Sequence, residues 1–171
     1  DTDGPWYSAK TINRLASVSK AVGGVLLYKL DELGLIDPSA RPSAYVDRLH
    51  KHHTHTLSQL ASCTSGVGHY PELGLGNYSV QHNTALGASE VFWNMSWGDP
   101  STKLVCIPGT CYDYSTHGYT LLGAAFEGAT GKRISTIVDD YLGTGLGLST
   151  LRAENRSVAN YFRTKLFNNI D

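Results

Sequence analysis

The sequence lacks a long apolar run and lacks a block of basic residues. Apolar segments such as Val25–Tyr28 are far shorter than the roughly 20 residues of a membrane-spanning helix. The 171-residue chain carries 14 basic and 15 acidic side chains, a net charge of -1, and this balance leaves no electrostatic footprint for nucleic acid. The composition therefore predicts one globular domain without a membrane span, whose partner is a small molecule or a peptide.

Cysteine is scarce, and its spacing excludes the common zinc motifs. The three cysteines are Cys63, Cys106 and Cys111. Cys106 and Cys111 bracket a turn at Pro108-Gly109, which could hold a short disulfide if the geometry allows it. The sequence leaves the pairing of the three thiols open, and a small, buried Cys63 is the simplest interpretation.

Three Asn-x-Ser triplets are candidate glycosylation sites. They begin at Asn77, Asn94 and Asn155. Their number, in a chain with few lysines, favours a secreted or extracytoplasmic glycoprotein.

Helical periodicity dominates the chain, and clean strand alternation is almost absent. Apolar residues recur at spacings of three and four from Val18 to Leu33, with Val25 and Leu26 among them, and predict a helix that ends at Gly34. Shorter helices are expected over residues 56–60, 85–93, 118–129 and 134–142, and a surface loop over residues 67–84. In the helix over residues 134–142, the expected buried side chains are Ile134, Ile137, Val138 and Tyr141.

The strongest chemical signal is a serine placed three residues before a lysine. Ser17 and Lys20 open the first predicted helix, and this spacing places both on one helix face. Serine needs a neighbouring base to remove its proton, and a lysine amine can serve when its surroundings lower its pKa. The alternative is an N-capping Ser17 followed by a solvated Lys20.

A second motif makes the pattern specific. The chain reads, in order, Ser17-Val-Ser-Lys20, Thr64-Ser-Gly66, Pro108-Gly-Thr110 and Tyr114-Ser-Thr-His-Gly-Tyr-Thr-Leu-Leu-Gly123. This order resembles the serine hydrolases of the β-lactamase and penicillin-binding-protein superfamily, in particular the class C β-lactamase and D-aminopeptidase/esterase branch. The resemblance covers residues 11–146.

The resemblance implies both a fold and a set of roles. The fold is the α+β, β-lactamase/transpeptidase-like fold. Ser17 would be acylated, Lys20 would be its base, and Tyr114 would help return the proton to the leaving group. Thr116 stands where many relatives have asparagine and would orient the substrate, which favours a peptidase or esterase over a dedicated β-lactamase. An aromatic core anchor is the alternative for Tyr114.

One part of the family pattern is missing. No Lys-Thr-Gly or His-x-Gly strand motif follows the tyrosine, although in the family its backbone supplies half of the oxyanion hole. We therefore expect residues 1–171 to form a single partial domain, mainly the helical lobe, with the central antiparallel sheet largely missing. A further polypeptide segment or a homo-oligomer would cover the apolar face that such a lobe exposes.

The histidine-rich tract offers a different chemistry. Four histidines, His50, His52, His53 and His55, crowd one loop, and such tracts can bind metal. Without a cysteine or carboxylate at ligand spacing, a solvated loop is the favoured interpretation. No metal and no cofactor are expected.

The predicted function is hydrolysis of an amide, ester or β-lactam through a serine acyl-enzyme. Two alternatives remain open: a catalytically silent structural or assembly subunit with the same fold, and a carbohydrate- or ligand-binding module that uses the same cleft.

Overall fold

A computed structural model describes residues 11–69, 84–88 and 104–153. These residues form η1 (Ala16–Val18), α1 (Ser19–Glu32), η2 (Pro42–Ala44), α2 (Leu57–Ala61), α3 (Ala85–Ala88), α4 (Thr116–Thr130), α5 (Ile134–Ile137) and η6 (Val138–Thr144). Within these ranges there is no β-strand, and Val67 and Leu104 form an isolated antiparallel bridge. The predominantly helical architecture expected from the sequence is therefore confirmed.

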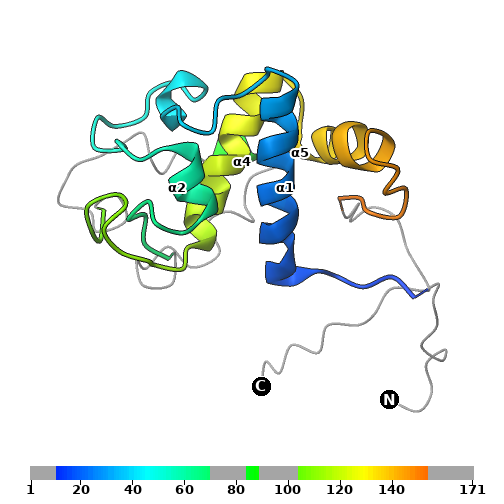
Figure 1. Cartoon of the computed structure of the whole chain (residues 1–171), viewed down its shortest axis with the longest axis horizontal. Coiled ribbons are helices and arrows are strands. Elements are labelled where there is room, and N and C mark those ends of the chain that lie inside the picture. The colour runs from blue at the N-terminus through cyan, green and yellow to red at the C-terminus, as the bar shows by residue number, and fades with distance from the viewer. Residues whose placement is uncertain (1–10, 70–83, 89–103, 154–171) are drawn as a thin grey trace, which may run out of the picture.

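Helix α4 is the centre of the fold. It contacts α1, α2, α3 and α5, and it crosses the middle of the molecule in Figure 1. Leu26, Leu27 and Leu30 of α1 share a buried core with α4 residues such as Leu122 and Phe126. Each such side chain contributes about 1.5–3 kcal/mol when it is removed from water, so this core fixes the position of α1 against α4.

Local signals set the ends of α2 and α4. Thr56 and Gln59 form a capping box at the start of α2, the short helix predicted over residues 56–60. Ser115 caps α4 by accepting the N–H of Gly118, and Gly131 ends α4 in the left-handed conformation, with φ of 67°. The predictions for these two helices are confirmed.

A buried carboxylate ties three helices together. Glu127 of α4 is 2% exposed, and its two oxygens accept backbone N–H groups from Leu86 of α3, at 2.8 Å, and from Ile134 of α5, at 2.9 Å. Because one side chain of α4 accepts from the first turns of both α3 and α5, Glu127 holds the helix starts at residues 85 and 134 against α4.

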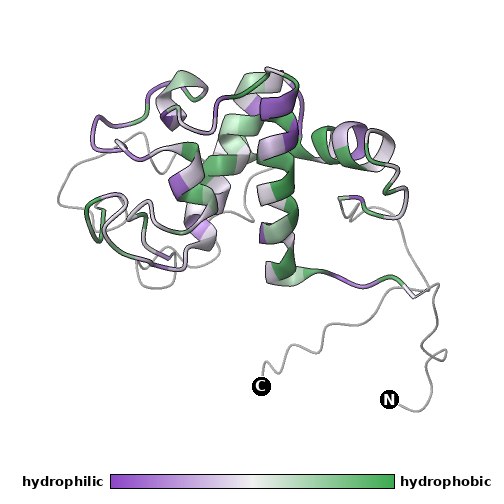
Figure 2. Ribbon diagram, viewed as in Figure 1, coloured by the Kyte–Doolittle hydropathy of each residue, from purple (hydrophilic) through white to green (hydrophobic). Residues whose placement is uncertain are grey.

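The buried face of α1 matches the predicted one only in part, since Leu26 and Leu30 are buried as expected. Val18, Val25 and Leu33 are 62%, 52% and 47% exposed, whereas Leu27, outside the predicted stripe, is fully buried. Apolar side chains lie on two faces of α1, which is green along much of its length in Figure 2, and periodicity alone could not tell which face meets α4. The exposed apolar face agrees with the expectation of a helical lobe whose sheet is largely missing.

The helix predicted over residues 134–142 is present in a different form. α5 ends at Ile137, and the chain continues as a π-helix to Thr144, where Gly145 N–H bonds to the Asp140 carbonyl at 3.0 Å. The wider turn rotates the later side chains. Ile137 is buried as expected and Leu142 is buried as well, while three side chains expected in the core are only half-buried: Ile134, Val138 and Tyr141.

Two further predictions are tested only in part. The helix expected over residues 85–93 is seen as Ala85–Ala88, and residues 89–93 lie outside the described residues. Most of the loop expected over residues 67–84 also lies outside them. No helix in the described part of the chain is long and apolar enough to span a membrane.

The solvated histidine loop is a wrong prediction for half of its histidines. His53 and His55 are 4% and 0% exposed, and the Nδ1 of His53 lies 3.1 Å from the Nε2 of His55. Burial lowers the pKa of His53 to about 3 and that of His55 to about 4. His50 and His52 stack face to face nearby, with ring centroids 4.7 Å apart. The sequence could not separate the two pairs, because burial of a polar loop residue depends on contacts distant in sequence.

Candidate active site

Ser17 lies in the short turn that leads into α1. It is exposed, and it sits in η1, two residues before Ser19, the first residue of α1. The preceding Ala16 has φ of 45°, in the left-handed region that alanine rarely adopts. This strained turn places the Ser17 hydroxyl at the helix entrance, where the backbone N–H groups and the helix dipole favour negative charge.

Lys20 lies one turn further along the helix and reaches all three predicted partners. Its Nζ donates to the Tyr114 hydroxyl at 2.7 Å, to Thr116 Oγ1 at 3.0 Å and to Ser17 Oγ at 3.4 Å. An ammonium group has three N–H donors, so the three acceptors match its full capacity. The structure thus brings together Ser17, Lys20, Tyr114 and Thr116, the four residues singled out in the sequence.

Tyr114 is the hub of this cluster. Its hydroxyl lies 2.6 Å from Ser17 Oγ, and either oxygen can be the donor. The hydrogen bond from Lys20, followed by the one with Ser17, lowers the pKa of the Tyr114 phenol below its usual value of 10.0. The side chain is 38% exposed, so the alternative of a core anchor is wrong for Tyr114.

That alternative does describe the neighbouring Tyr119. Its hydroxyl donates to the Ala61 carbonyl at 2.6 Å, and burial raises its pKa. The centroid of its ring also lies 5.6 Å from Lys20 Nζ. Tyr119 therefore anchors α4 against α2 beneath the cluster.

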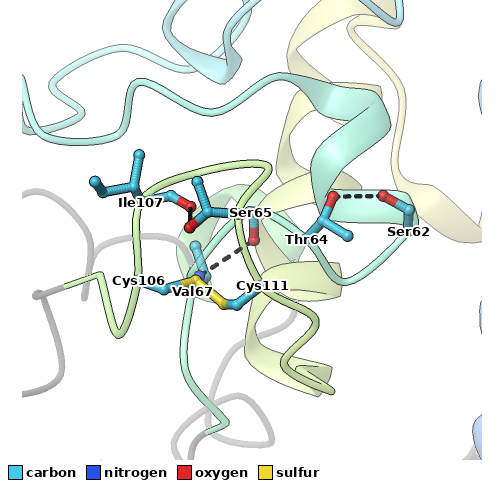
Figure 3. The surroundings of a disulfide bond; sticks show 8 residues. Ser62, Thr64, Ser65, Val67, Cys106, Ile107 and Cys111 are labelled. Atoms are coloured by element: carbon cyan, nitrogen blue, oxygen red, sulfur yellow. Dashed lines mark hydrogen bonds between the residues drawn. A yellow bond between two sulfur atoms is a disulfide. The ribbon is translucent and has the colours of Figure 1, made fainter.

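A disulfide-closed loop leads the chain to Tyr114. Cys106 and Cys111 are bonded, with Cα atoms 6.4 Å apart, as Figure 3 shows. The Gly109 N–H donates to the Thr64 carbonyl at 2.8 Å, and the Asp113 N–H donates to the Cys63 carbonyl at 2.9 Å. The pairing that the sequence left open is thereby settled: Cys63 is the free, buried thiol.

The Thr64-Ser65-Gly66 motif packs against the loop that the disulfide closes. Gly66 has φ of 76°, and a Cβ at this position would collide with the Cys106 carbonyl. The Gly66 carbonyl accepts the Val105 N–H at 2.7 Å, while Ser65 Oγ accepts the Val67 N–H at 3.2 Å (Figure 3). Only glycine permits this close approach, so the motif positions the loop that delivers Tyr114.

One residue of the site, His69, was not predicted from the sequence. Its Nδ1 accepts the backbone N–H of Thr116 at 3.3 Å, and its ring meets the Tyr114 ring edge-on, with centroids 5.6 Å apart. It follows the Thr-Ser-Gly motif by three residues. That proximity in sequence was the one available signal.

Other predicted sites fall elsewhere. The sequon residues Asn77, Asn94 and Asn155 lie outside the described residues. Within the ranges that the structure describes, no three histidine, cysteine, aspartate or glutamate side chains are grouped so that they could hold a metal ion.

The geometry defines a class of site: a serine hydroxyl bonded to a tyrosine phenol, with a lysine ammonium in contact with both. Such a site can move a proton away from serine and return it later. A β-lactamase family model matches residues 2–155, and the chain belongs to the β-lactamase family.

Solved structures of this family share the fold. A penicillin-binding protein from Bacillus halodurans superposes with a TM-score of 0.66 at 18% identity, covering 84% of this chain and 42% of that one. A D-stereospecific amidohydrolase from Streptomyces sp. gives 0.58 at 21% identity, covering 78% and 42%. An octameric penicillin-binding protein homologue from Pyrococcus abyssi gives 0.56 at 20% identity, covering 77% and 30%.

The chain therefore matches less than half the length of these three structures. The comparison with curated protein sequences gives no match. Together the family match and the solved structures establish the β-lactamase/transpeptidase-like fold, represented in the described residues mainly by helices.

Proposed function

We propose that this protein is a serine hydrolase that cleaves an amide, ester or lactam through an acyl-enzyme on Ser17. The observation that carries the proposal is the contact of three functional groups: Ser17 Oγ, the Tyr114 phenol and Lys20 Nζ lie within 2.6–3.4 Å of one another. Within the β-lactamase family, this combination supports nucleophilic catalysis rather than simple ligand binding.

In the first step, Ser17 Oγ attacks the carbonyl carbon of the substrate and loses its proton. The distances favour Tyr114 as the immediate acceptor, because its hydroxyl is closer to Ser17 than Lys20 is. The Lys20 ammonium would stabilise the phenolate form of Tyr114 that accepts the proton, and this is consistent with the lowered pKa of Tyr114. The sequence predicted a variant of this scheme, in which Lys20 takes the proton from Ser17 directly.

In the second step, the bond from the carbonyl carbon to the leaving nitrogen or oxygen breaks. Tyr114 passes its proton to that atom, which departs as a neutral amine or alcohol, and the acyl group stays on Ser17. Water then attacks the acyl carbon while Tyr114 takes one of its protons. The bond from that carbon to Ser17 Oγ breaks, Tyr114 returns the proton to Oγ, and the acid product leaves.

Thr116 is proposed to orient the substrate. Its hydroxyl accepts from Lys20 at 3.0 Å, so it would also hold the lysine toward Tyr114. Threonine offers a single hydroxyl where asparagine offers an amide. This difference supports a peptidase or esterase over a dedicated β-lactamase, and a solved structure of similar fold is a D-stereospecific amidohydrolase.

We further propose that the helical lobe is completed by additional polypeptide or by other copies of the chain. The apolar face of α1 is exposed, and the matched structures are more than twice as long as the segment they share with this chain. A similar-fold homologue forms an octamer. The intact mass of native material tests this: a single species of 18.5 kDa that stays monomeric would contradict it.

Fluorophosphonate or fluorescent-penicillin labelling tests the activity. We expect a covalent adduct on Ser17 in the native protein, lost in Ser17→Ala and kept in the matched variant Ser19→Ala, which removes an exposed serine two residues away. Absence of any adduct in the native assembly would reject the hydrolase. A silent structural or assembly subunit would then be favoured, because the fold would be retained without the chemistry.

Export is proposed on the basis of the three sequons alone. Treatment of native protein with an N-glycosidase should increase its electrophoretic mobility, and the shift should decrease stepwise when Asn77, Asn94 and Asn155 are replaced by glutamine. Unchanged mobility would remove the basis for this proposal.

A further inference from the structure

Two short segments that are far apart in sequence, Gly68–His69 and Ser115–Thr116, are joined by hydrogen bonds next to Tyr114. Ser115 Oγ donates to the Gly68 carbonyl at 3.0 Å, and Thr116 N–H donates to His69 Nδ1 at 3.3 Å. The two bonds join the consecutive residues Ser115 and Thr116 to the consecutive residues Gly68 and His69. Between them they restrain the backbone on the C-terminal side of Tyr114.

His69 also touches Tyr114 itself. The two rings meet at an interplanar angle of 76°, with their centroids 5.6 Å apart. This edge-to-face geometry is the one that aromatic rings prefer, and such pairs are worth about 0.5–1.5 kcal/mol beyond the area they bury. The opposite, polar end of Tyr114 is held by Ser17 and Lys20, so His69 restrains the ring at a different point.

The hydrogen bond from Thr116 specifies the form of His69. An imidazole nitrogen accepts a hydrogen bond only when it carries no proton, so Nδ1 must be the unprotonated nitrogen of the ring. His69 must therefore act as a hydrogen-bond acceptor at Nδ1. A side chain that keeps an acceptor at the Nδ1 position should replace His69 best.

We propose that His69 is a positioning residue for Tyr114: its Nδ1 fixes the Thr116 backbone and its ring edge fixes the phenol, so that the hydroxyl stays between Ser17 and Lys20. The consequence for catalysis rests on the proposed function. The positioning itself does not, because it concerns the place of the Tyr114 hydroxyl whether or not Ser17 reacts.

Four substitutions separate the two contacts. His69→Asn places an amide near the Nδ1 position, whereas His69→Gln places it near Nε2. His69→Phe keeps an aromatic ring without an acceptor, and His69→Ala removes both contacts. His52→Ala, which removes an exposed imidazole from the histidine tract, is the matched control.

The first readout is the rate of Ser17 labelling by a fluorophosphonate, divided into the affinity for the probe and the rate of reaction at saturation. We expect His69→Ala and His69→Gln to react about five- to tenfold more slowly at saturation, as loss of one hydrogen bond predicts, with unchanged affinity. The melting temperature should fall by a few degrees, because the same contacts stabilise the fold. His69→Asn and His69→Phe each keep one of the two contacts and should give intermediate rates, with that of His69→Asn nearer to the native one.

The second readout does not need activity. In protein labelled with ¹³C at tyrosine Cζ, the Tyr114 signal, assigned with Tyr114→Phe, reports the pKa of the phenol. Displacement of the hydroxyl from Lys20 should raise that pKa in His69→Ala and His69→Gln and should raise it less in His69→Asn, while His52→Ala should leave it unchanged.

The two readouts distinguish the two proposals. If native protein is not labelled at Ser17 but the Tyr114 pKa responds as expected, the hydrolase is rejected and the positioning role stands. If labelling occurs, and His69→Ala leaves both the saturated rate and the Tyr114 pKa unchanged, the positioning role is rejected. It is rejected also if His69→Gln restores both readouts as well as His69→Asn does.

Discussion

The Tyr114 hydroxyl lies 2.6 Å from Ser17 Oγ although 97 residues separate the two in sequence. Ser17 is held by the turn before α1 and Tyr114 by the loop before α4, so the contact depends on how these two helices pack. Lys20 Nζ, 2.7 Å from the same phenol, completes the arrangement.

Removing the lysine charge should change the pH dependence of Ser17 labelling. Because Lys20 lowers the pKa of Tyr114, the labelling rate should rise with pH as the phenol ionises, at a pH below its usual value. In Lys20→Met this rise should move to higher pH, and the rate near neutral pH should fall about 10²-fold or more.

Lys29→Met is the matched control for this experiment. Lys29 lies on the same helix, where it pairs with Glu32 at 2.8 Å, and an exposed pair of this kind contributes little to stability. A pH profile that is the same in Lys20→Met and in native protein would exclude Tyr114 as the group that titrates.

The buried histidines should make the fold sensitive to acid. Burial is the main cause that lowers the pKa of His53 to about 3 and those of His55 and His117 to about 4, whereas an exposed histidine titrates near 6.5. The unfolded chain therefore binds protons that the folded chain does not. Stability should be complete above about pH 6.5 and should fall steadily toward pH 4.

Urea unfolding between pH 7.5 and pH 4 measures this effect. Each histidine contributes a slope of about 1.4 kcal/mol per pH unit where only the unfolded chain is protonated. His55→Gln and His53→Gln should each reduce the total slope by about that amount, while His52→Gln, at an exposed position, should not. Equal slopes in all four proteins would contradict the prediction.

Loss of the Glu127 carboxylate should destabilise the helix junction. Glu127→Ala would leave the backbone N–H groups of Leu86 and Ile134 without the acceptor they now have. Both N–H groups are part-buried, and an N–H that loses its acceptor costs up to about 1–3 kcal/mol, so we expect a loss of about 1–4 kcal/mol in unfolding free energy. Glu127→Gln keeps one oxygen acceptor and should lose about half as much.

Thermal or urea unfolding of the two Glu127 variants tests this. Glu32→Gln, an exposed change on α1, serves as the control and should alter stability by less than about 0.5 kcal/mol. A Glu127→Ala protein as stable as the control would show that the junction does not depend on the carboxylate.

Reduction of the Cys106–Cys111 disulfide should loosen the approach to Tyr114. A loop of this length stabilises a fold by about 2 kcal/mol in the chain-entropy treatment. We expect a reducing agent to lower the melting temperature and to slow Ser17 labelling, because the loop from Val105 to Asp113 carries Tyr114 at its end.

The remaining cysteine provides the control for this experiment. In Cys63→Ala the reducing agent should act as it does on native protein, since Cys63 is the free thiol. In the double variant Cys106→Ser, Cys111→Ser it should have no further effect. A reductant effect that disappears in Cys63→Ala would assign the sensitivity to Cys63 instead.

Local features of the fold were predicted well from the sequence. Helix α4 was expected over residues 118–129 and spans Thr116–Thr130, because its Ser115 cap and its Gly131 end act over a single turn. Predictions that required long-range packing were less accurate. The buried face of α1, the π-helical end after Ile137 and the burial of His53 and His55 all depend on segments distant in sequence.

The site divides in the same way. The sequence by itself determined that Ser17 and Lys20 share one helix face, because a spacing of three residues is a property of the helix alone. Only the tertiary structure decided that the Tyr114 phenol reaches both of them and that His69 contacts Tyr114 and Thr116. These contacts arise from the packing of α1 on α4 and from the loop closed by Cys106 and Cys111, and no local pattern encodes them.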